Sequence, residues 1–108
     1  MQAHGRIVVI TSAATRSCPA DAALYAGAKM AMEAFARCLS RELGHRGITV
    51  NVVAPGIIES DMSAGVFDAE TIARMVPMKR AGSPDDVAHL VGFLASEQAR
   101  YKIGRAHV

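Results

Sequence analysis

A tyrosine and a lysine, Tyr25 and Lys29, stand four residues apart in a run of small residues that suit a helix. Positions i and i+4 share a helix face, so the phenol and the ammonium point into the same space. A phenol is a weak acid near neutral pH, and a neighbouring cation favours its ionised form. The pair is therefore a candidate for proton transfer to or from a substrate. Taken alone, each residue has a simpler interpretation, Tyr25 as a packing residue and Lys29 as a solvated one.

Two short apolar runs flank this pair and predict β-strands. Residues 7–10 are continuous and rich in β-branched side chains, as in a strand that is buried on both faces of a parallel sheet. Residues 48–53 form the second run, which Pro55-Gly56 ends. Between the two runs, residues 21–43 contain no proline and much alanine, and they predict one long helix.

The ends and the buried side of this helix can also be predicted. Asp21 is a plausible N-cap, and Gly44 with Gly47 ends the helix. Apolar residues that repeat at helical spacing predict the stripe that faces the core. These residues are Ala28, Met32, Phe35, Leu39 and Leu43.

A strand, a long helix and a strand joined by short links form a βαβ unit, which requires parallel pairing and a right-handed crossover. In such sheets, ligands bind beyond the carboxyl ends of the strands. Ser12 follows the first strand and Pro55-Gly56 follows the second. Tyr25 and Lys29 lie in the first turns of the helix, so all these residues are predicted at one edge of the sheet.

The second half of the chain is less regular at first. Within residues 57–80, a short helix is predicted around positions 68–76, where Pro77 ends it. Residues 83–86 read Ser-Pro-Asp-Asp, which places an N-cap, a first-turn proline and two carboxylates at a helix start. The apolar residues of this helix are Val87, Leu90, Val91 and Leu94.

Composition excludes several classes of function. The net charge of the 108 residues is only +2 and no basic run is present, which argues against a nucleic-acid partner. No apolar run reaches the length of a membrane span, so no membrane partner is expected. Cys18 and Cys38 are isolated and lack a zinc-binding pattern, which predicts two reduced thiols, a cytoplasmic protein and no metal site.

The candidate residues form part of a longer pattern over residues 5–101. It comprises Ser12 after a strand, Tyr25-x-x-x-Lys29, Asn51-x-x-x-Pro55-Gly56 and Arg80-x-Gly82-x-Pro84-x-Asp86. In order and spacing, the chain resembles the C-terminal part of a short-chain dehydrogenase/reductase, and it is closest to the 3-oxoacyl-[acyl-carrier-protein] reductase branch. The resemblance implies an α/β fold, namely an incomplete C-terminal part of a doubly wound, Rossmann-like parallel sheet with three αβα layers.

The resemblance also implies a role for each candidate residue. Tyr25 would exchange a proton with the substrate oxygen, Lys29 would favour the phenolate and bind the nicotinamide ribose, and Ser12 would hydrogen-bond the substrate oxygen. Ser60 stands where the family usually has threonine. The residues implied to contact the cofactor, NADP or NAD, are Tyr25, Lys29, Pro55, Gly56, Ile58 and Ser60. The implied substrate is a small-molecule carbonyl or acyl thioester, and the branch points to a 3-oxoacyl thioester.

Some parts of the family pattern have no counterpart in the chain. They are the Gly-x-x-x-Gly-x-Gly nucleotide loop, the residue that selects NAD or NADP, and the catalytic asparagine. Thr15 also stands where the family commonly has glycine. We therefore expect residues 1–101 to be the C-terminal catalytic part of a single Rossmann-like domain. Residues 102–108 depart from the family, and positions 103–108 match the translated read-through of a sequencing adapter, so we expect a non-native tail.

Two hypotheses of different classes follow. The parent protein is an NAD(P)-dependent short-chain oxidoreductase, expected to form a homo-oligomer. Alternatively, the chain is a catalytically inactive fragment that only associates with full-length subunits. An unrelated binding module with a chance Tyr/Lys pair is disfavoured by the register of the whole pattern. Because a sheet of two strands leaves its edges exposed, we expect the isolated chain to aggregate, to bind no nicotinamide cofactor and to be inactive.

Overall fold

Two of the predicted strands pair in parallel at the centre of the computed structural model, which describes residues 4–59, 67–104 and 106–107. Strand β1 (Arg6–Ile10) lies beside β2 (Thr49–Val53), in register from Arg6 opposite Thr49 to Ile10 opposite Val53. The long helix α2 (Ala23–Leu43) connects them, after a short helix α1 (Ala14–Ser17). The predicted βαβ unit is therefore present.

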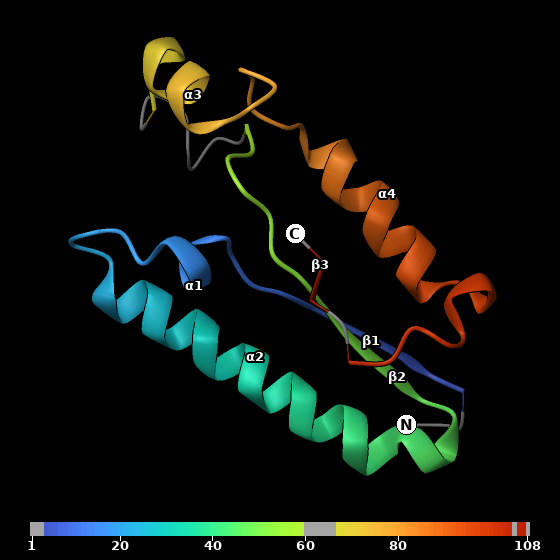
Figure 1. Ribbon diagram of the computed structural model, residues 1–108. Coiled ribbons are helices and arrows are strands. Elements are labelled where there is room, and N and C mark those ends of the chain that lie inside the picture. Colours follow the sequence, from blue (N-terminus) through green and yellow to red (C-terminus); the bar gives the residue numbers. More distant parts are fainter. Residues whose placement is uncertain (1–3, 60–66, 105, 108) are drawn as a thin grey trace.

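The sheet lies between helices on its two faces. Figure 1 shows α2 on one side of the strands and α4 (Pro84–Ala95) on the other. On the α2 side, Val50 and Val52 pack with Ala36. On the α4 side, Val53 packs with Leu94 and the nearby Ala99. The alternation of β2 side chains between two apolar layers builds the αβα arrangement.

The side of α2 that meets the sheet differs from the predicted stripe. Leu39 and Leu43 pack on the core as expected, but Ala28, Met32 and Phe35 are exposed, Phe35 to 64%. The buried positions of α2 are instead Ala26, Ala36 and Ser40. Small side chains on that side let the helix approach the strands closely, and Met32 and Phe35 face outward.

The predicted ends of α2 are partly confirmed. Asp21 does not cap the helix, because its φ of 66° turns the chain before the start and Ala22 is the N-cap. At the other end, Gly44 is the C-cap and begins a 3-10 turn, Gly44–Arg46. Gly47, with a φ of 72°, follows that turn in the left-handed region that favours glycine.

Both helices predicted in the second half are confirmed. Helix α3 (Ala69–Met75) begins after Asp68, whose carboxylate accepts a hydrogen bond from Thr71 N at 2.7 Å. Helix α4 begins with a capping box, in which Ser83 and Asp86 each accept a hydrogen bond from the other's backbone N–H. A 3-10 turn, Glu97–Ala99, follows α4.

A third strand, β3 (Ala106–His107), extends the sheet beyond β2, although no strand was predicted in residues 102–108. It pairs in parallel with Val52 and Val53. The approach to it is fixed by the buried Asn51, whose Nδ2 donates to Lys102 O at 2.9 Å, and by Gly104 N, which donates to Val50 O at 2.9 Å. Pairing with β2 therefore places residues 106–107 in a strand, although their own sequence does not predict one.

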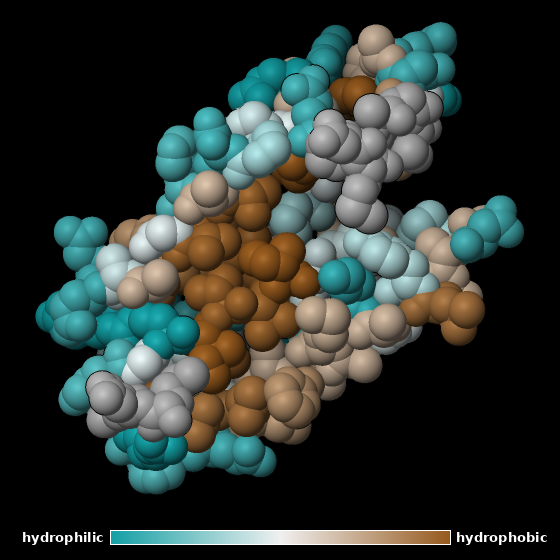
Figure 2. Space-filling view, turned by 180° about the vertical axis from the view of Figure 1, so that it is seen from behind, coloured by the Kyte–Doolittle hydropathy of each residue, from teal (hydrophilic) through white to brown (hydrophobic). Residues whose placement is uncertain are grey.

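The sheet order β1-β2-β3 leaves β1 at an edge, where backbone groups are available to a further strand. Figure 2 shows apolar side chains gathered across the middle of the face opposite to the view of Figure 1. Within the described residues, no helix combines the length and the apolar character needed to cross a membrane.

Candidate active site

The loop that carries Ser12 runs beside the segment that follows β2. Thr11 N donates to Val53 O at 2.8 Å, and Ala13 N donates to Pro55 O at 2.9 Å. These bonds continue the parallel pairing past the ends of both strands. The loop with Ser12 and the segment with Pro55 are therefore neighbours at the carboxyl edge of the sheet, as the predicted βαβ unit implies.

Tyr25 and Lys29 lie on one face of the first turns of α2. The Lys29 Nζ atom is 5.8 Å from the centroid of the Tyr25 ring, within the range of a cation–π contact. The same Nζ donates to Ile10 O at 3.4 Å, at the end of β1. Tyr25 is 52% exposed, so its ring is open to a ligand while the lysine links the helix to the sheet edge.

Ser12 is half-buried, and its Oγ accepts a hydrogen bond from Ala14 N at 3.1 Å. Because the hydroxyl acts there as an acceptor, its own proton is free to be donated to another oxygen. Helix α1, which starts two residues later, packs against α2. Ser12 is thus held beside the helix that carries Tyr25 and Lys29.

Two threonines close to Ser12, Thr11 before it and Thr15 in α1, bind Glu33, which the sequence did not indicate as a site residue. Thr11 Oγ1 donates to Glu33 Oε1 at 2.9 Å, and Thr15 Oγ1 lies 3.1 Å from the same oxygen. Glu33 follows Lys29 by four residues, so it shares a helix face with the Tyr/Lys pair. The i+4 spacing from Lys29 was visible in the sequence, but the threonine partners became evident only from the fold.

The segment after β2 contains three of the residues implied in cofactor binding. Pro55 and Ile58 are half-buried, and Gly56 is exposed. Ile58 forms a parallel bridge with Gly82, supported by hydrogen bonds from Glu59 N to Gly82 O at 2.8 Å and from Gly82 N to Ile57 O at 2.9 Å. Ser60, the fourth residue of this set in the segment, lies outside the described residues.

Gly82 leaves little space beside Ile58. A Cβ atom built on Gly82 would lie 2.8 Å from Ile58 Cδ1, closer than real Cβ contacts. The glycine therefore allows the residues that precede α4 to pack closely against the segment that follows β2.

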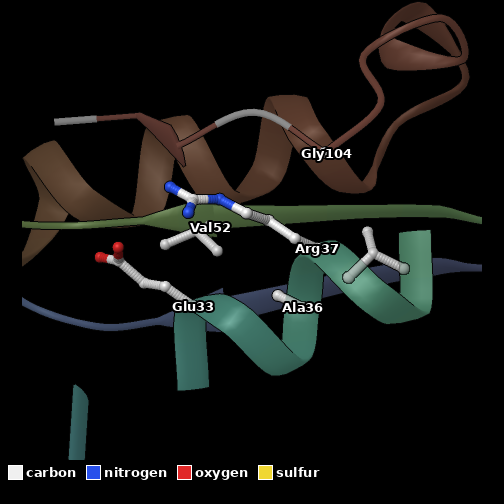
Figure 3. A pocket seen from close by; sticks show the side chains of 6 residues that line it. Glu33, Ala36, Arg37, Val52 and Gly104 are labelled. Atoms are coloured by element: carbon white, nitrogen blue, oxygen red, sulfur yellow. The ribbon is translucent and has the colours of Figure 1, made fainter. Parts of the chain in front are cut away.

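A shallow concavity over β2 adjoins this edge and shares Glu33 with it. In the view of Figure 3, the Arg37 guanidinium lies above Val52, the Glu33 carboxylate lies to its left, and Ala36 lies below. Val50 and Gly104 complete its lining. Ser12, Tyr25 and Lys29 are not among the lining residues. Among the described residues, no group of three or more histidine, cysteine or carboxylate side chains is placed to hold a metal ion.

Comparison with known proteins identifies the family. The model of a family described as Enoyl-(Acyl carrier protein) reductase matches residues 1–108. The chain belongs to the short-chain dehydrogenase/reductase family. The 3-oxoacyl-[acyl-carrier-protein] reductase FabG of Escherichia coli (strain K12) is 44% identical to it over 103 residues, covering 94% of this chain and 42% of that enzyme. Hydroxynaphthalene reductase arp2 of Aspergillus fumigatus is 37% identical over 119 residues, covering 96% of this chain and 44% of that protein.

Solved structures of similar proteins share the fold of this short-chain dehydrogenase/reductase. A blue fluorescent protein from a metagenomic library, in complex with NADPH, gives a TM-score of 0.91 at 38% identity, over 99% of this chain and 44% of that protein. The structure of ElxO with NADP bound gives 0.86 at 31% identity, over 95% of this chain and 44% of that protein. The predicted family and α/β fold class are confirmed, and the chain spans less than half the length of the relatives it matches.

Proposed function

We propose that the full-length protein is an NAD(P)H-dependent carbonyl reductase that acts on a 3-oxoacyl thioester, with Tyr25 as the proton donor. The observation that carries the proposal is the Lys29 ammonium, 5.8 Å from the ring of a half-exposed tyrosine and hydrogen-bonded to the end of β1. The similarity to FabG reductases, whose names specify a 3-oxoacyl carrier-protein substrate, supports the substrate class.

In the reduction, the residues of this chain manage the proton and the substrate oxygen. The nicotinamide cofactor supplies the hydride that reaches the carbonyl carbon. Tyr25 gives its phenolic proton to the carbonyl oxygen, so that the product is an alcohol and the tyrosine is left as a phenolate. Lys29 stabilises this phenolate through its positive charge. The Ser12 hydroxyl donates a hydrogen bond to the oxygen while negative charge develops on it.

The residues present fit the nicotinamide half of such a cofactor. Gly56 is exposed, and a Cβ built on it would meet no atom within 4 Å, so a flat ring can approach the backbone there. Pro55 and Ile58 would provide the wall, Lys29 would hold the ribose, and Tyr25 would lie at the reacting side. Ser60 lies outside the described residues, and its part in cofactor binding stays a prediction. Binding of the remaining nucleotide is assigned to the part of the full-length relatives that this chain does not match.

The outer face of α2 favours an association of subunits. Leu24 is 92% exposed and Phe35 is 64% exposed, which is unusual for large apolar side chains on one helix. We propose that α2 forms a subunit contact in a homo-oligomer of the full-length protein. We also propose that this protein acts in the cytoplasm.

The same surface supports the second candidate function, a catalytically inactive chain that only associates with full-length subunits. Co-purification with full-length protein without added reductase activity would support this second function.

The reductase proposal is tested with the full-length protein, a 3-oxoacyl thioester and NADPH, by following NADPH absorbance. The variant Tyr25→Phe keeps the ring and removes the proton, so kcat should fall by about 10²–10⁴-fold, as for loss of a general acid. Tyr101→Phe is the matched control, because Tyr101 is 89% exposed and far along the chain from the pair. Equal activity of the two variants would refute Tyr25 as the donor.

A further inference from the structure

A single carboxylate oxygen connects the Ser12 loop to helix α2. Thr11 and Thr15, which flank Ser12, lie 2.9 and 3.1 Å from Glu33 Oε1 through their hydroxyl oxygens. Both threonines are buried, with 4% and 7% exposure, and Glu33 is half-buried. We propose that Glu33 is a positioning residue that fixes Ser12 relative to Tyr25 and Lys29. This inference rests on the proposed reductase function.

Glu33 continues the helix face that carries the chemistry. It lies one turn beyond Lys29 and two turns beyond Tyr25, and residues four apart are neighbours on a helix surface. Lys29 Nζ binds Ile10 O, and Glu33 binds Thr11, the next residue along the chain. Two successive turns of α2 are thus attached to two successive residues at the end of β1. These two bonds fix the position of Tyr25 and Lys29 along the strand direction relative to the loop that carries Ser12.

The loop is held from two sides by different kinds of bond. On the β2 side, Thr11 N and Ala13 N donate to the main chain of Val53 and Pro55. On the α2 side, the bonds run between side chains and converge on Glu33. A substitution of Glu33 removes only the side-chain bonds, so the loop should open more often while the sheet stays folded.

A carboxylate suits this position because one of its oxygens can accept both hydroxyl protons. Thr15 Oγ1 has one proton, which it shares between Glu33 and Ser12 O at 3.0 Å. An aliphatic residue in place of Glu33 would leave Thr11 without this acceptor in a buried setting, which is unfavourable. The loop would then shift to find other partners, and Ser12 would move with it.

The test compares Glu33→Leu and Glu33→Gln in the full-length protein, with Glu42→Leu as a matched change at an exposed position of α2. Glutamine keeps an acceptor oxygen and should preserve most of the activity. Leucine should lower kcat by about 10–100-fold, since a misplacement of roughly 1 Å can cost about 10²-fold. The affinity for NADPH, measured by fluorescence titration, should stay unchanged, because Ser12 acts on the substrate oxygen.

Hydrogen exchange provides a readout that does not require activity. In Glu33→Leu, the amides of residues 11–15 should lose protection, while those of β2 keep theirs. Unchanged kcat together with unchanged exchange in Glu33→Leu would overturn the proposal. A loss of protection throughout the chain in Glu33→Leu would also overturn it, and so would a loss of kcat in Glu33→Gln as large as that in Glu33→Leu. If the unsubstituted protein reduces no carbonyl compound, the proposed function fails, and exchange in residues 11–15 alone then decides whether Glu33 holds the loop.

Discussion

Replacing Thr49 with valine is expected to stabilise the protein. Thr49 begins β2 and is 3% exposed, and its Oγ1 atom is buried with no hydrogen-bond partner among the described residues. Burial of a hydroxyl without a hydrogen bond costs about 1–3 kcal/mol in protein mutational data. Valine has the same branched shape and an equally high preference for strands. The free energy of unfolding of Thr49→Val should therefore rise by about 1–3 kcal/mol.

The gain should persist in the full-length protein. The Thr49 oxygen is already out of contact with solvent inside this chain, in the central strand of the sheet. Because residues of this chain already enclose the oxygen, we expect it to stay buried in the full-length protein. The magnitude can therefore be derived from this chain and measured on the longer one.

Urea unfolding at a fixed protein concentration measures the effect, since oligomer formation makes stability depend on concentration. The midpoint should rise with an unchanged slope. Thr71→Val is the matched control, because the Thr71 hydroxyl on α3 is only half-buried and accepts a bond from Arg74 at 3.5 Å. It should give no gain. A Thr49→Val variant that is no more stable than the unsubstituted protein would show that the hydroxyl is satisfied, and would refute the reasoning.

Two further predictions concern α4 and its approach. In Gly82→Ala, the new Cβ would lie 2.8 Å from Ile58 Cδ1 and should displace that side chain. The dissociation constant for NADPH should therefore rise while kcat changes little. Unaltered NADPH binding would show that Ile58 does not contact the cofactor. The backbone N–H of Ser83, followed by its hydroxyl, lowers the pKa of Asp86 from its ordinary value of 3.8. A carboxylate with a lowered pKa stabilises the folded state at pH values above its ordinary pKa, and this stabilisation is lost as the pH falls through the pKa of the folded state. The stability advantage of the unsubstituted protein over Asp86→Asn should therefore shrink below about pH 4. Urea unfolding across this range, with Asp85→Asn as control, measures it, and an advantage that does not vary with pH would contradict the prediction.

Local chemistry made much of the architecture predictable. The β-branched run before Thr11 and the run before Pro55 have few alternatives to buried strands, and a helix between them requires a parallel pair. The start of α4 was equally clear, because the residues that cap a helix lie within four positions of one another. The edge that gathers the candidate residues follows from this connectivity. The catalytic roles of Ser12, Tyr25 and Lys29 remain predictions.

Other features depended on partners that are distant in sequence. Hydropathy gave the spacing of apolar residues on α2, but only packing decided that Ala36 rather than Phe35 meets the strands. Asp21 has the side chain of an N-cap, yet its backbone turns away before the helix begins.

The sequence by itself determined β1, α2, β2, α3 and α4, the parallel connection of the two strands, and the family, because these depend on residues close together in the chain. Only the tertiary structure decided which face of α2 is buried, that residues 106–107 extend the sheet, and that Glu33 binds Thr11 and Thr15. Each of these is a contact between segments that folding brings together from tens of positions apart. Such a contact depends on the geometry of both partners, which neither segment specifies alone.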